Sequence, residues 1–242
     1  MEWKQRLRIV LMRPRNALNI GAAARAMFNF GFDDLWLVDP YEPAFRRAKS
    51  AMGAARVLEQ AHVTSDPAEA LGEATLVVAS SALQGRSTDI VQRELAPGGT
   101  VLRSHLEAGR AALLFGPEKT GLSREDLSFA DWIVTIPTNP SCPSMNLGQA
   151  VAVCCYELAQ QSRAVPELKT PATIPAEQRA RILDVLLPIL SDSGFLFDEG
   201  LEAQTQKLRR WVGRLRLAPR DGQLFLGILR QIRWRLDHPG EP

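Results

Sequence analysis

Five short runs of apolar residues, with helix-like stretches between them, constrain the fold of this chain most. The runs are nearly continuous in apolar residues, and they cover residues 7–12, 35–38, 75–79, 111–115 and 132–136. Strands of this kind are buried on both faces, as in a parallel sheet that is covered by helices. We therefore predict an α/β domain over residues 1–162, with a mostly parallel sheet covered by helices.

Helices are expected between these strands and behind the last one. They cover residues 19–30, 67–73, 100–107, 123–129 and 145–161. The first is expected to stop at Gly31, because glycine readily adopts the left-handed conformation that ends many helices. The last is expected to take Ser144 as its N-cap. It should be buried, since residues 150–156 are apolar nearly all round.

The composition changes after residue 162. Pro166, Pro171 and Pro175 fall within a short polar stretch, which predicts a linker over residues 163–175. Three helical segments follow, and no strand pattern appears among them; they cover residues 176–190, 201–215 and 220–236. We therefore predict a small all-helical module over residues 176–242.

The charge of the chain is concentrated in this helical module. The net charge is only +2, but nine basic residues lie between Lys207 and Arg235, and Asp221 is the only acid among them. A local excess of this kind favours a polyanionic partner. A solvated basic helix face is the alternative interpretation.

The sequence offers no signal for several other classes of protein. No apolar run reaches the length of a membrane span or of a signal-peptide core. The cysteines, Cys142, Cys154 and Cys155, suit neither a disulfide framework nor a zinc site, so we expect reduced thiols in a cytoplasmic protein. The sequence has no dinucleotide-binding fingerprint, Walker A sequence or nucleophile elbow. The three histidines are scattered along the chain, and no metal site is expected.

Polar or proline-rich loops follow four of the five predicted strands. These loops begin at Arg13, Ser80, Gly116 and Pro137. Ligands of an open parallel sheet bind outside the carboxyl ends of its strands, so these loops form the candidate site. The last loop is stiffened by three prolines. It either presents fixed backbone groups to an adenine or a ribose, or it is only a rigid connection.

Three segments at these loops resemble the three motifs of the TrmH (SpoU) branch of the SPOUT methyltransferases. They read Asn16-x-x-Asn19-Ile20-Gly21-Ala22-x-x-Arg25, Leu114-Phe115-Gly116-Pro117-Glu118-x-x-Gly121-Leu122 and Ile136-Pro137-x-x-Pro140-x-x-Pro143-Ser144-Met145-Asn146-Leu147. Three motifs in the family's order are highly specific together. The resemblance implies a fold with a C-terminal trefoil knot, S-adenosyl-L-methionine as the cofactor, and a homodimer.

The resemblance also implies roles for individual residues. The residues expected to bind the cofactor are Ser80, Ser81, Ala82, Gly116, Ile136, Pro143, Ser144 and Met145. Arg25 is expected to be the catalytic arginine, with Ser144 and Asn146 beside it. Asn16, Asn19 and Glu118 are expected to bind substrate. The two asparagines also suit turns and helix caps, and Glu118 either binds substrate or orients its loop.

The predicted activity is methylation of a ribose 2'-hydroxyl in RNA. Residues 35–40 and the C-terminal helices resemble a subfamily that acts on pyrimidines in the tRNA anticodon loop, at a site of the position-32 type. Arg209, Arg210 and Arg214 are the predicted RNA contacts of the helical module. No DNA or membrane partner is expected. The alternatives are an enzyme of the same branch that acts on ribosomal RNA, and an RNA-binding protein without catalysis.

Overall fold

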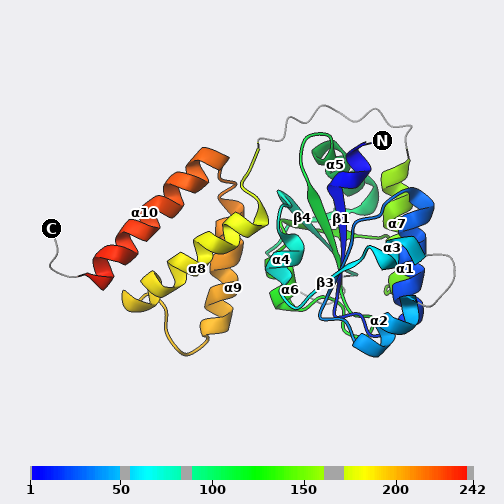
Figure 1. Cartoon of the computed structure of the whole chain (residues 1–242), viewed down its shortest axis with the longest axis horizontal. Coiled ribbons are helices and arrows are strands. Elements are labelled where there is room, and N and C mark those ends of the chain that lie inside the picture. The colour runs from blue at the N-terminus through cyan, green and yellow to red at the C-terminus, as the bar shows by residue number, and fades with distance from the viewer. Residues whose placement is uncertain (1, 50–54, 83–88, 161–171, 239–242) are drawn as a thin grey trace.

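The computed structural model describes residues 2–49, 55–82, 89–160 and 172–238, and it contains a seven-stranded parallel sheet (Figure 1). The strand order is β3-β2-β1-β6-β4-β7-β5. The strands are β1 (Leu7–Met12), β2 (Leu35–Val38), β3 (His62–Thr64), β4 (Leu76–Ser80), β5 (Gln92–Glu94), β6 (Ala111–Phe115) and β7 (Trp132–Thr135). The predicted α/β fold is therefore confirmed, and the trefoil knot stays a prediction.

The sequence pattern does not predict β3 and β5, which form the two edges of the sheet. Each is three residues long, and their side chains are mostly exposed. An edge strand has one neighbour and needs no apolar run, so an analysis based on apolar runs cannot find it.

Helices cover both faces of the sheet. One face is covered by α1 (Ala17–Phe30), α5 (Leu95–Leu106) and α7 (Leu147–Ala159), and the other by α4 (Pro67–Leu71) and α6 (Arg124–Ser128). The 3-10 helix (Glu2–Arg6) and two further helices, α2 (Glu42–Lys49) and α3 (Ala55–Glu59), complete this part of the chain. The sequence pattern predicts none of these three short segments.

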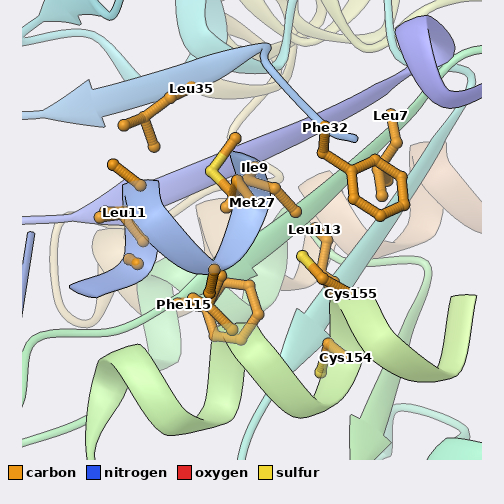
Figure 2. Packing of buried hydrophobic residues seen from close by; sticks show 14 of the residues in the cluster. Leu7, Ile9, Leu11, Met27, Phe32, Leu35, Leu113, Phe115, Cys154 and Cys155 are labelled. Atoms are coloured by element: carbon orange, nitrogen blue, oxygen red, sulfur yellow. The ribbon is translucent and has the colours of Figure 1, made fainter. Parts of the chain in front are cut away.

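Successive residues of the central strands point alternately to the two faces of the sheet. Leu7, Ile9 and Leu11 of β1 pack with α1 and α7, whereas Val10 and Met12 pack with α4 and α6. This alternation follows from the two-residue period of a strand. Figure 2 shows the first of these clusters, in which the strand side chains lie against the helix side chains. Because both faces are buried, the strands read as continuous apolar runs in the sequence.

Helix α5 begins five residues before its predicted start at residue 100. Pro97 lies in its first turn, where proline is tolerated because the missing N–H has no partner within the helix. Gly98 packs directly under β7, since a Cβ there would lie 3.0 Å from the Trp132 ring. The sequence suggests a loop at this proline and these glycines. In the structure, Pro97 lies at the helix start, and Gly98 allows close contact with Trp132.

The prediction that Ser144 caps the last helix is wrong. Helix α7 begins at Leu147 and is capped by Asn146, whose side-chain oxygen accepts from the backbone N–H groups of Gly148 (2.9 Å) and Gln149 (3.3 Å). Asparagine and serine are both good caps, so the local sequence does not choose between them. The shift leaves Ser144 and Met145 in the loop before the helix.

The C-terminal helices pack around an apolar core of their own. They are α8 (Ala176–Asp192), α9 (Leu201–Arg214) and α10 (Pro219–Asp237), each within two residues of its predicted bounds. Ile182 of α8, Val212 of α9 and Leu226 of α10 are among the buried residues of this core. Among the described residues, no helix has both the length and the apolar character that a membrane span needs.

Backbone hydrogen bonds attach α8 to the α/β part. The N–H groups of Ala176 and Glu177 donate to the carbonyls of Ala74 (2.8 Å) and Gly72 (3.0 Å). Most of the predicted linker, with Pro166 and Pro171, lies outside the described residues. Its last part is packed, because Ile174 is buried and donates its N–H to the carbonyl of Leu217 (2.9 Å). The division at 1–162, 163–175 and 176–242 stays a prediction.

Close packing of α1 on α7 gives a test of the fold by mutation. A Cβ added at Gly148 would lie 2.6 Å from the Cβ of Ala22 on α1. We predict that Gly148→Ala lowers the free energy of unfolding by about 1–3 kcal/mol, because the two helices must move apart. Chemical denaturation measures this change.

Gly21→Ala on α1 is the matched control, since its Cβ would meet no atom of the described residues within 4 Å. It is expected to stabilise the protein by roughly 0.5–1 kcal/mol, because alanine loses less backbone entropy than glycine on folding. Equal stability of Gly148→Ala and the wild-type protein would show that the helix contact is not tight.

Candidate active site

A cavity of about 310 Å³ lies at the carboxyl ends of β4, β6 and β7, between the loops that follow these strands. All the residues predicted to bind the cofactor line it; they are Ser80, Ser81, Ala82, Gly116, Ile136, Pro143, Ser144 and Met145. The three strands are neighbours in the sheet but far apart in the sequence. The parallel sheet is what brings their loops together, as expected for a ligand site of this class.

The loop after β6 folds into a closed turn that requires glycine. A Cβ at Gly116 would lie 2.2 Å from the backbone nitrogen of Leu122, which no side chain can tolerate. The N–H of Gly121 donates to the carbonyl of Pro117 (2.8 Å), and Gly121 has a φ of 65°. Only glycine adopts this conformation without strain. The turn therefore brings backbone atoms to the wall of the cavity.

The loop after β7 is held in shape by its own hydrogen bonds. The Thr138 hydroxyl donates to the carbonyl of Pro143 (3.0 Å), and the side chain of Asn139 accepts from the N–H of Ser141 (2.9 Å). The N–H of Cys142 donates to the carbonyl of Asn139 (2.8 Å). These contacts, with the prolines, fix Pro143, Ser144 and Met145 against the cavity.

The carboxylate of Glu118 joins the loop after β6 to the start of α1. It accepts from the backbone N–H of Asn16 (3.2 Å) and from the side-chain amide of Asn19 (3.0 Å). The Asn19 oxygen in turn accepts from the amide of Asn146 (2.8 Å). A negative charge at a helix N-terminus is favourable, because the first N–H groups of a helix lack partners within it. We infer that Glu118 orients these segments.

Asn16 also serves as the N-cap of α1. Its side-chain oxygen accepts from the N–H of Leu18 (2.9 Å). The first motif therefore contains two asparagines with different structural contacts. Asn16 shapes the helix start, and Asn19 links it to Glu118 and Asn146.

Arg25 lines a second cavity, of about 700 Å³, together with residues at the N-terminus of α1. Arg15 and Arg47 line the same cavity, and none of the described residues that line it is acidic. Arg25 and Ser144 thus line different cavities of one chain. Sequence reasoning did not single out Arg47, because it lies on α2, a short helix that the pattern does not predict.

The three arginines predicted to bind RNA differ in their surroundings. The Arg209 guanidinium donates to the Ser128 hydroxyl (2.9 Å) and lies 4.2 Å from the centre of the Phe129 ring. Burial lowers the pKa of Arg209. Arg209 therefore attaches α9 to α6, and its contact with RNA stays a prediction. Arg210 and Arg214 have no ion-pair partner within the described part of the chain.

An ion pair close to Arg209 also connects the two parts. Arg179 of α8 lies 2.8 Å from the carboxylate of Asp131, and both side chains are largely buried. Buried pairs of this kind hold geometry firmly, because removal of one partner leaves an uncompensated charge. The helical module is thus fixed against the sheet domain at α4, α6 and Asp131, the residue before β7.

The buried cysteines are not candidate nucleophiles. Cys154 and Cys155 lie in the core under the sheet (Figure 2). Burial raises the pKa of both thiols, and that of Cys155 reaches about 12. Thiols with such pKa values stay protonated and unreactive at neutral pH.

Known proteins match both parts of this chain. Residues 6–156 match the SpoU rRNA Methylase family. The tRNA (cytidine/uridine-2'-O-)-methyltransferase TrmJ of Escherichia coli K12 is 34% identical over 238 residues, which cover 94% of this chain and 95% of that protein. TrmJ of Yersinia pestis (strain Pestoides F) is 33% identical over 243 residues, 96% of this chain and 93% of that protein.

Solved structures agree with this similarity. The crystal structure of TrmJ from Z. mobilis ZM4 has a TM-score of 0.81 and 31% identity, and the match covers 93% of this chain and 98% of that one. A probable methylase family protein from Haemophilus influenzae Rd KW20 has a TM-score of 0.60 and 29% identity, with 97% and 98% covered. The fold and site define a methyltransferase. The chain belongs to the SpoU methylase family.

Enzymes of this family use S-adenosyl-L-methionine, and the first cavity suits it. Its volume lies at the lower end of the range for small-molecule sites. Its wall combines backbone groups around Gly116 with apolar side chains such as Ile136 and hydroxyls such as Ser80. The cofactor supplies a methyl group on a positively charged sulfur, which is already activated for transfer.

The turn at Gly116 gives a test of the cofactor site. We predict that Gly116→Ala lowers the affinity for S-adenosyl-L-methionine about tenfold or more, a loss of at least about 1.4 kcal/mol. The reason is that the added methyl group forces the turn open. Isothermal titration with the cofactor measures the affinity, and circular dichroism checks the fold.

Gly227→Ala on α10 is the control, because in the described part of the chain a Cβ there meets no atom within 4 Å. It should bind the cofactor as the wild-type protein does. Unchanged affinity of Gly116→Ala would mean that the cofactor does not contact this turn.

Proposed function

We propose that this protein methylates the 2'-hydroxyl of a pyrimidine ribose in the anticodon loop of tRNA, at a site of the position-32 type. The observation that carries the proposal is the extent of the similarity to TrmJ, which includes the helical module as well as the sheet domain. A cytoplasmic location follows from the substrate. The cofactor cavity and the cavity lined by Arg25 carry out methyl transfer, and the helical module makes further contacts with RNA.

The reaction requires the ribose oxygen to lie in line with the methyl group and to lose its proton. Correct placement of the two reactants is itself a large part of the rate enhancement. Arg25 is a poor general base, because the pKa of arginine lies above about 12. Its guanidinium instead holds a phosphate of the RNA and stabilises negative charge on the 2'-oxygen. Arg15 beside it adds to the attraction for phosphate.

The enzyme acts as a homodimer in which Arg25 serves the partner's cofactor cavity. Two features support this arrangement. Arg25 and the cofactor cavity are separate within one chain. Arg25 also lies on an exposed face of α1 and α7 with Leu18 (80% exposed), Phe28 (52%) and Tyr156 (53%). Large apolar side chains that gather on one face mark a protein interface.

The direct test is transfer of labelled methyl from S-adenosyl-L-methionine to unmodified tRNA, followed by nucleoside analysis. We predict a 2'-O-methylated cytidine or uridine that maps to the anticodon loop. Transfer to ribosomal RNA and not to tRNA would favour the alternative suggested by the name of the family model, SpoU rRNA Methylase. Cofactor binding without transfer to either RNA would favour an RNA-binding protein.

Substitution of Arg25 by lysine tests whether the reaction needs the planar guanidinium group or only a positive charge. We predict that Arg25→Lys lowers kcat about a hundredfold or more, since lysine keeps the charge but cannot make the two-pronged contact. Cofactor affinity should be unchanged, because the assigned role of Arg25 is to hold the RNA and stabilise the 2'-oxygen, and lysine keeps the positive charge. Single-turnover methyl transfer measures the rate, and near-normal activity would contradict the assigned role.

The helical module is expected to contact the phosphate backbone through Arg210 and Arg214. We predict that replacing both with glutamine weakens tRNA binding. The slope of log K against log salt should become shallower by about 1 for each lost phosphate contact. Fluorescence anisotropy at several salt concentrations measures this slope.

Arg181→Gln is the control, because Arg181 is exposed on α8 and its guanidinium pairs with Glu177. It removes one positive charge, where the double variant removes two, and this charge lies away from the predicted contact, so the slope should not change. If the double variant also keeps the wild-type slope, Arg210 and Arg214 do not bind phosphate.

A further inference from the structure

Helix α10 carries an exposed row of aliphatic side chains along its outer face. Leu224, Ile228 and Ile232 are 66%, 48% and 42% exposed. They recur every four residues, so they lie along one side of the helix. The opposite side, with Leu226 and Leu229, is buried in the core of the module. Figure 1 shows α10 at the edge of the module that lies away from the sheet.

Opposite charges stand at the two ends of this row. Asp221 lies in the first turn of α10 and Arg235 in the last, and both are exposed. At 100° per residue, these two side chains and the three aliphatic ones fall within an arc of about 80°. Neither charge has an ion-pair partner among residues 2–49, 55–82, 89–160 and 172–238. We define these five residues as the α10 stripe.

The α10 stripe is complementary to itself. Ile228 is its midpoint, with Leu224 and Ile232 four residues away on either side, and Asp221 and Arg235 seven residues away. In an antiparallel pair with its twofold axis at Ile228, Leu224 faces Ile232 of the second copy, and Asp221 faces Arg235. Self-complementarity of this kind is what an isologous contact between two identical chains requires.

We propose that α10 pairs antiparallel with α10 of a second copy of this chain, with Ile228 at the twofold axis. Aliphatic side chains are covered in the centre, and two interhelical ion pairs close the ends. The centre of the α10 stripe is apolar and does not suit a phosphate backbone. The α10 stripe therefore favours a protein partner over RNA. A single helix pair buries less than the roughly 800 Å² per partner of a standard interface, so the contact depends on protein concentration.

Cysteine crosslinking tests both the contact and its register. The background is Cys142→Ser, because Cys142 is exposed and the other two cysteines are buried. In it, Ile228→Cys is expected to form covalent dimers with a thiol-to-thiol reagent that spans about 8 Å, since packed helix axes lie about 8–10 Å apart. Leu224→Cys and Ile232→Cys alone should react little. Each is displaced from its own copy by eight residues, about 12 Å along the axis.

A mixture of the Leu224→Cys and Ile232→Cys proteins should crosslink as fast as Ile228→Cys. The control is Arg230→Cys, which is exposed on the same helix but lies outside the α10 stripe. We expect its covalent dimer to form at least about tenfold more slowly, because the distance excludes the reagent. Crosslinking is detected on α10 itself, so its outcome is independent of the proposed α1–α7 dimer.

Two results would overturn the proposal. One is equal crosslinking of Ile228→Cys and Arg230→Cys. The other is an unchanged weight-average mass of Ile228→Glu in sedimentation at high concentration. The proposed pair predicts a lower mass, because the substitution places a carboxylate at the centre of the pair. An unchanged mass together with about tenfold weaker tRNA binding would show that the α10 stripe contacts RNA instead.

Discussion

The carboxylate of Glu118 connects the segments on which the site depends. It accepts hydrogen bonds from the start of α1, at Asn16 and Asn19, and through Asn19 it reaches Asn146 before α7. These segments are far apart in the sequence and meet because parallel strands bring their carboxyl ends to one edge of the sheet. The tight turn at Gly116 then places Glu118 where it can make these contacts. Loss of this carboxylate would remove the hydrogen bonds that join the loop after β6 to the start of α1.

This network lies between two cavities of different chemistry. The cofactor cavity is lined mainly by backbone, apolar and hydroxyl groups, whereas the described residues that line the second cavity include three arginines and no acid. The first suits a compact cofactor and the second a phosphate of the RNA. The helical module is fixed to the sheet domain through Arg179, Arg209 and the backbone of α8. A fixed module presents Arg210 and Arg214 in a constant position relative to the cavities.

Much of this was predictable from the sequence, for physical reasons. The five buried strands and the three C-terminal helices are predicted because buried strands are apolar throughout and the helices are long. The residues expected to bind the cofactor came from the resemblance to the family, and they line one cavity because the loops that follow parallel strands converge. The edge strands β3 and β5 were missed, since exposed strands leave no apolar run. The start of α7 was misplaced because Ser144 and Asn146 are equally good caps.

The surroundings of individual arginines were not predictable, because they depend on tertiary contacts. Arg209 and Arg210 are adjacent in a basic run, but only Arg209 lies against Phe129 and Ser128. Likewise, Arg25 belongs to the first motif, yet the structure places it in a cavity apart from Ser144. Sequence similarity assigns a residue to a site, and it does not say which copy of the chain that residue serves.

The measurement that tests this account most directly is activity of a heterodimer made from Arg25→Ala and Gly116→Ala. The heterodimer is isolated with two different affinity tags and assayed at a cofactor concentration too low for the Gly116→Ala homodimer. If Arg25 serves the partner's cavity, one of the two sites combines an intact Gly116 turn with an intact Arg25. The heterodimer should then recover about half of the wild-type methyl transfer to tRNA. No activity in a correctly assembled heterodimer would contradict the account and assign Arg25 to the cavity of its own chain.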